Sequence, residues 1–94
     1  MNRLKKEFQQ WVATRPPIIQ AAIAKFPPMT VLNLPKMGRC YVIGWAETTG
    51  GGVQLIVSEG DPRDGYDEAF AVRQYVCIEH ITPEMRVGQE GWTR

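Results

Sequence analysis

The sequence has no long apolar run and few cysteines, and each shortage excludes a class of protein. No apolar stretch approaches the roughly 20 residues that a membrane-spanning helix needs. The basic N-terminus lacks the continuous apolar core of a signal peptide, so we expect a cytoplasmic protein that does not bind a membrane. Two cysteines, Cys40 and Cys77, are too few for a secreted disulfide scaffold. We expect both thiols to be free.

The sequence also offers little material for a metal or catalytic site. His80 is the single histidine, and it forms a Cys-x-x-His pair with Cys77. A structural zinc site usually takes four ligands, commonly as two such pairs, and here only Cys40 remains. Three positions apart on a strand, Cys77 and His80 would point to opposite faces, which separates a nucleophile from its base. The sequence therefore predicts no catalytic residue, no metal and no cofactor, in a protein that is not an enzyme.

A run of three glycines, residues 50–52, raises the question of a phosphate-binding loop. Such a loop joins a strand to a helix whose N-terminus meets the phosphate, and the Walker motif also contains Lys followed by Ser or Thr. Here the glycines separate two segments rich in β-branched and aromatic residues, 39–47 and 53–59. This arrangement predicts the turn of a β-hairpin.

The length of 94 residues and a hydrophobic content of 44% fit one globular domain. Apolar side chains at helical spacing predict an amphipathic helix over residues 3–13. A second apolar stripe predicts a helix over residues 17–26, which Pro17 begins and a Phe-Pro-Pro sequence stops. We therefore expect a helical segment at 1–28, a β region at 29–82 and a C-terminal tail at 83–94.

From Thr30 onward the period of the apolar residues changes to that of strands, predicted at 30–34, 39–47, 53–59 and 69–81. In the second of these strands Tyr41, Ile43 and Trp45 alternate with smaller residues, which places the three on one face. We expect Tyr41 and Trp45 to be core residues covered by Trp11 and Phe26.

Neither strand of the central hairpin has a plainly polar face, so we expect cover on both sides, with the helices as that cover. Gly44 is where the sheet could bend. The predicted fold is α+β. Two short N-terminal helices pack on a small antiparallel SH3-like barrel or on a strongly bent sheet of four or five strands.

Two segments carry a resemblance to known proteins. Residues 15–43 read RPPIIQAAIAKFPPMTVLNLPKMGRCYVI, and residues 75–83 read YVCIEHITP. The first resembles small uncharacterised bacterial and phage proteins, in which an R-P-P start, a short helix and an F-P-P break precede a strand, a glycine turn and a second strand. The resemblance implies an accessory gene of a phage or mobile element, and it brings no activity and no catalytic residue.

Charge is divided unevenly along the chain, although the net charge is only +1. Residues 1–39 carry a net charge of +6, and residues 40–94 carry a net charge of −5. The two halves either complement each other or form a nucleic-acid-binding arm on one side. In the nucleic-acid interpretation the contacts come from the basic N-terminal helices, through Arg3, Lys5, Lys6 and Arg15.

The absence of catalytic and cofactor motifs favours an interaction protein that binds a protein partner or itself. The candidate partner-binding residues are Trp11 and four residues of the acidic loop, Asp61, Asp64, Tyr66 and Asp67. The spacing of these acids does not match an EF-hand, so we expect a basic partner here and not calcium. We favour a homodimer over a monomer. The stripe of Leu4, Phe8 and Trp11 would supply apolar contacts, and the basic helix of one chain would lie against the acidic 59–68 loop of the other.

Overall fold

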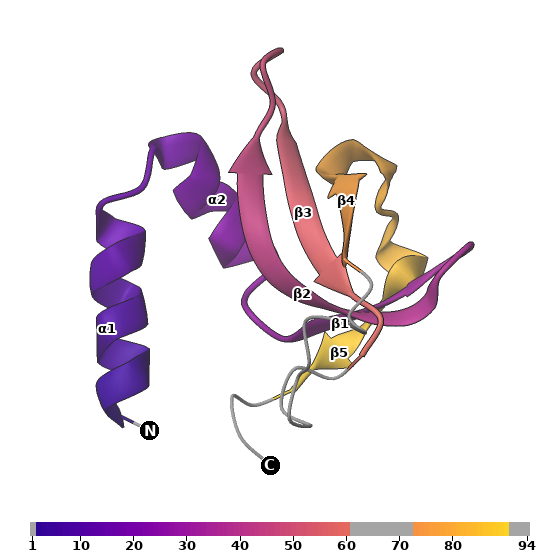
Figure 1. Cartoon of the computed structure of the whole chain (residues 1–94), viewed down its shortest axis with the longest axis horizontal. Helices are drawn as coiled ribbons and strands as arrows, with labels where there is room; N and C mark the ends of the chain where they lie inside the picture. Colours follow the sequence, from indigo (N-terminus) through magenta and orange to yellow (C-terminus); the bar gives the residue numbers. More distant parts are fainter. Residues whose placement is uncertain (1, 61–72, 91–94) are drawn as a thin grey trace.

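The computed structural model describes the backbone of residues 2–60 and 73–90, and the side chains from Lys6 onward within those ranges. Two helices come first, and strands and short 3-10 turns follow (Figure 1). The elements in chain order are α1 (Asn2–Ala13), α2 (Pro17–Lys25), β1 (Thr30–Leu34), β2 (Gly38–Glu47), β3 (Val53–Ser58), β4 (Arg73–Cys77), η1 (Ile78–His80), η2 (Pro83–Met85) and β5 (Arg86–Gln89). No helix among these residues is long and apolar enough to cross a membrane.

The strands form one five-stranded antiparallel sheet in the order β4-β3-β2-β1-β5. The α+β class, with two helices before the sheet, is therefore confirmed. The long strand β2 curves through the middle of the sheet (Figure 1), but the sheet does not close into a barrel. Of the two forms that the sequence allows, the structure has the bent sheet.

The C-terminal part of the chain differs from its prediction as a tail. Residues 83–85 form η2, and residues 86–89 form β5, which pairs with β1. The amide of Glu90 then donates a hydrogen bond of 3.0 Å to the carbonyl of Met29. This strand escapes pattern analysis because backbone hydrogen bonds hold it, while all three of its side chains are exposed. At the other edge, the strand predicted at 69–81 is observed as β4 followed by η1, and residues 69–72 lie outside the described ranges.

The glycine run is a hairpin turn, as predicted. The amide of Thr48 donates to the carbonyl of Gly52 at 2.9 Å, and the amide of Gly52 donates to the hydroxyl of Thr48 at 2.9 Å. Gly51 has a φ of 85°, in the region that favours glycine. Because β3 follows directly, no helix N-terminus is present to meet a phosphate.

A β-bulge in β2 decides which side chains face the core. The register advances from Val42 to Gly44 on β2 while it moves only from Val57 to Ile56 on β3. The extra residue reverses the alternation, so Trp45 shares a face with Val42 and not with Tyr41. The prediction that Tyr41 and Trp45 lie on one face was therefore wrong. The alternation of large and small residues continues unbroken along the sequence and gives no sign of the bulge.

The main core lies on the face of the sheet that carries Trp45, which we call the inner face. Its fully buried centre comprises Leu32, Cys40, Val42, Leu55 and Val57. On the other face, the outer face, Tyr41 packs in a separate buried cluster with Met29 and Val31. Tyr41 is thus buried as predicted, although its neighbours are not Trp11 and Phe26.

Both helices pack on the inner face. Ile19, Ala22 and Ile23 of α2 contact Val53, and this cluster reaches Phe8 and Val12 of α1. The indole N–H of Trp45 donates a hydrogen bond of 2.9 Å to the carbonyl of Phe26, directly after α2. The expectation that the helices cover both faces was wrong, because the short link from Phe26 to Thr30 holds α2 on the side of Trp45.

The bulge leads to a prediction about Gly44. A Cβ at this position would lie 2.9 Å from Cδ1 and 3.3 Å from Cβ of Ile56, closer than ordinary contacts allow. We expect Gly44→Ala to lower the free energy of unfolding by about 1–3 kcal/mol, as overpacking does. Removing Cδ1 with Ile56→Val should recover part of that loss in the double variant, measured by urea unfolding. Strictly additive effects of the two substitutions would contradict the proposed contact.

Candidate interaction surface

Two rows of side chains on the outer face of the sheet are only half-buried or exposed within the described residues. The strand register aligns Gly44 of β2, Ile56 of β3 and Tyr75 of β4. The next row aligns Ala46, Gln54 and Cys77. These six residues, which we call the Tyr75 surface, include no charged side chain. Tyr75 itself is 61% exposed, the largest exposed fraction among the large apolar side chains of the described residues.

The Tyr75 surface ends at an edge of the sheet. Within the described residues β4 pairs with β3 on one side and with no strand on the other. An edge strand presents backbone N–H and C=O groups that can pair with another strand, and proteins often block such edges with Pro or Lys. The five residues of β4 include neither, and Arg73 is their single charge. Within residues 2–60 and 73–90, therefore, no strand occupies this edge, which could pair with a second chain.

Trp11, a predicted partner-binding residue, has both a structural and an exposed part. Its ring centroid lies 5.7 Å from that of Phe8 and 6.3 Å from that of Trp45. The guanidinium of Arg15 lies 5.0 Å from its ring centroid, and Trp11 remains 42% exposed. The contact of Trp11 with Trp45 agrees with the prediction that Trp11 covers this side chain. Because Trp11 helps to hold α1 against the sheet, a substitution there would change stability as well as any binding.

The other predicted binding residues are placed only in part. Asp61, Asp64, Tyr66 and Asp67 lie outside the described residues, as do the side chains of Leu4, Arg3 and Lys5. Lys6 is exposed on α1. The Arg15 guanidinium donates to the hydroxyl of Thr14 at 3.1 Å. The structure therefore brings Arg15 to Trp11 but does not test an acidic docking loop.

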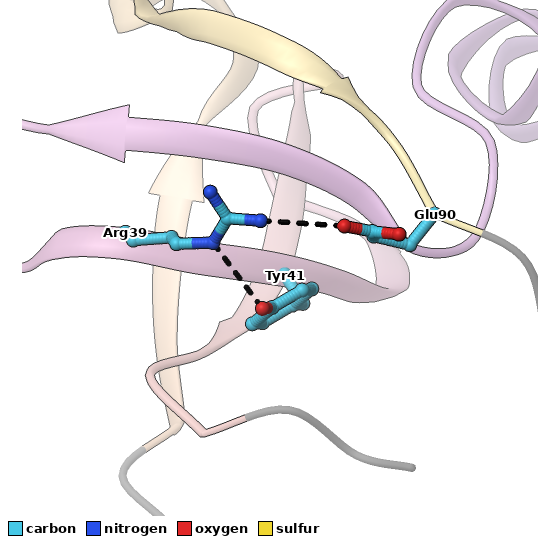
Figure 2. A network of polar contacts seen from close by, with 3 residues as sticks. All are labelled: Arg39, Tyr41 and Glu90. Atoms are coloured by element: carbon cyan, nitrogen blue, oxygen red, sulfur yellow. Dashed lines mark hydrogen bonds and ion pairs between the residues drawn. The ribbon is translucent and has the colours of Figure 1, made fainter. Parts of the chain in front are cut away.

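Two further basic residues are engaged within the chain. Arg39 donates to the hydroxyl of Tyr41 at 3.3 Å and forms an ion pair of 3.3 Å with Glu90 (Figure 2). Arg86 donates to the carbonyl of Lys25 at 2.7 Å and lies 5.6 Å from the ring centroid of Phe26. Both guanidinium groups therefore have partners within the chain, which weakens the case for one phosphate-binding face.

The two cysteines lie on opposite faces of the sheet. Cys40 is fully buried on the inner face, where burial and then the negative charge of Glu59 raise the pKa of its thiol to about 11. Cys77 lies on the outer face, 3.9 Å from the amide nitrogen of Gln54. The sheet itself thus separates the two thiols, and the described residues contain no group of three metal-ligating side chains.

Comparisons of the chain with protein families, with curated proteins and with solved structures find no match. The resemblance to small bacterial and phage proteins therefore stays a prediction.

The positions of the cysteines predict unequal reactivity. At pH 8 the Cys40 thiol should stay protonated and shielded, so that a disulfide reagent such as DTNB modifies Cys77 much faster in the native protein. Cys77→Ser should abolish the fast phase, and Cys40→Ala should leave it unchanged. Unfolding in urea should release a second reactive thiol. Equal rates for the two thiols in the native state would contradict this arrangement.

Proposed function

We propose that this protein is a non-enzymatic interaction protein whose partner is a second copy of the same chain, bound along β4. The observation that carries the proposal is the exposed Tyr75 at a sheet edge that no described strand pairs. The two free cysteines agree with a reducing, cytoplasmic location. The resemblance stated above adds an origin in a phage or mobile element.

The sequence of β4 suits pairing with itself around a two-fold axis. Antiparallel pairing centred on Tyr75 places the two Tyr75 rings opposite each other, where aromatic pairs stabilise a sheet. The same register places Arg73 opposite Cys77 of the partner subunit. The two Arg73 charges are therefore at opposite ends of the shared ladder and do not repel each other strongly.

The size of the contact sets the expected affinity. A standard interface buries roughly 800 Å² on each partner. β4 contains five residues, so a contact restricted to its edge is smaller than this. We therefore expect a weak dimer that dissociates in the micromolar range.

Sedimentation equilibrium tests the proposal directly. At tens of micromolar the wild-type mass should approach twice 10.7 kDa and fall on dilution. Tyr75→Lys should return the mass to that of a monomer, because it sets two ammonium groups opposite each other at the axis. The matched control is Val87→Lys, since Val87 is 57% exposed on the opposite edge strand β5. A monomer mass at every concentration, or loss of the dimer only in the control, would refute pairing through β4.

Nucleic-acid binding is the alternative function, and the stacking of Arg15 on a half-exposed Trp11 favours it. Aromatic rings with adjacent cations are a common platform for single-stranded bases. We expect no binding to single-stranded or duplex DNA at about 50 or 200 mM salt, measured by fluorescence anisotropy. A micromolar affinity that weakens at the higher salt and is lost in Arg15→Ala would favour the alternative.

A further inference from the structure

A hollow lies on the inner side of β4, away from the Tyr75 surface. Its volume is about 270 Å³, and its walls come from the β1–β2 turn, β4, η1 and η2. Five apolar side chains line it: Leu34, Pro35, Met37, Val76 and Met85. All of them except Pro35 belong to the main core or pack against it, so the floor of the hollow is continuous with that core.

Three polar side chains that can donate hydrogen bonds also line this hollow. Lys36, Gln74 and His80 supply an ammonium group, an amide and an imidazole, and no Asp or Glu is among the lining residues. All three side chains are exposed. Each can donate a hydrogen bond, and the imidazole retains a donor when it is neutral. Within the described residues Lys36 makes no hydrogen bond or ion pair, so its charge is available to a ligand.

A second hollow, of about 250 Å³, shows the contrast. Lys25, Phe26 and Arg86 line it together with Ile81, Thr82 and Pro83. The guanidinium of Arg86 already has partners within the chain, because it donates to the carbonyl of Lys25 and lies over the ring of Phe26. The hollow beside β4 has no such internal partner for its cation.

We propose that the hollow beside β4 binds a small carboxylate with an apolar body, such as a medium-chain or aryl carboxylate. The apolar body contacts Met37, Val76 and Met85, where flexible thioethers adapt to the shape of the ligand. The carboxylate accepts hydrogen bonds from Lys36 and His80. A single ammonium group matches one negative charge, and the apolar floor excludes a strongly hydrated ion such as free phosphate. The size of the hollow fits one small molecule and not a folded partner.

Methionine-methyl NMR tests the proposal, with octanoate as the probe and 1-octanol as its uncharged counterpart. The methyl signals of Met37 and Met85 should shift with octanoate and reach saturation. Met29 is the internal control, because it is buried in the cluster on the outer face and its signal should stay in place. No saturable shift of Met37 and Met85, or an equal shift of Met29, would overturn the site.

Charge recognition is tested by substitution at the rim. Lys36→Gln should weaken octanoate binding about fivefold, the upper range for an exposed ion pair, and should leave octanol binding unchanged. The control Lys6→Gln removes an exposed lysine of α1 and should change neither affinity. Equal wild-type affinities for octanoate and octanol would overturn the carboxylate class. Tyr75→Lys should leave the octanoate shifts intact, so this result is independent of the proposed dimer.

Discussion

The bulge between Val42 and Gly44 is the constraint on which the arrangement of the chain depends. By adding one residue to β2, it turns Trp45 toward the inner face, beside Val42 and opposite Leu55. There the indole packs against the ring of Trp11, and its N–H donates a hydrogen bond to the carbonyl of Phe26. Without the bulge, Trp45 would lie on the outer face, and α1 and α2 would lose the side chain that they share.

The link between α2 and β1 strengthens this arrangement. Thr30 donates from its hydroxyl to the carbonyl of Pro27 at 2.6 Å, and the amide of Met29 donates to the carbonyl of Val42 at 2.9 Å. Met29 has a φ of 67°, a conformation that costs a residue other than glycine of order 1 kcal/mol or more. Its burial and its backbone hydrogen bonds with Val42 and Glu90 hold that conformation. The helices are thereby fixed to one face, so neither of them covers the β4 end of the outer face.

Local patterns predicted the elements well, because each depends on residues close in sequence. Helical spacing placed α1 and α2, and the glycine run placed the β2–β3 turn. The bulge could not be predicted, since the alternation of Tyr41, Ile43 and Trp45 continues through it. β5 was missed because backbone pairing with β1 holds it, and its sequence has no apolar period.

The candidate surfaces could be predicted less well than the helices and strands, because they combine residues that are far apart in the sequence. Tyr75 stands in the sequence as one strand aromatic among several, and only the strand order reveals that it lies at an edge. The contact of Trp11 with Trp45 could be predicted from the apolar stripe of the first helix, whereas a binding role for Trp11 stays a prediction. Lys36, Gln74 and His80 are 38 and 6 positions apart along the chain, and folding alone brings them to one hollow.

The alternation of side chains along β4 connects the proposed dimer and the proposed ligand site. Gln74 and Val76 lie opposite Val57 and Leu55 on the inner face, whereas Tyr75 lies opposite Ile56 on the outer face. A single strand can therefore line a hollow with two residues and present a third to a partner, because successive side chains point to opposite sides. The dimer would use the backbone edge and Tyr75, and the ligand would use the inner side chains. Neither function requires a group that the other occupies.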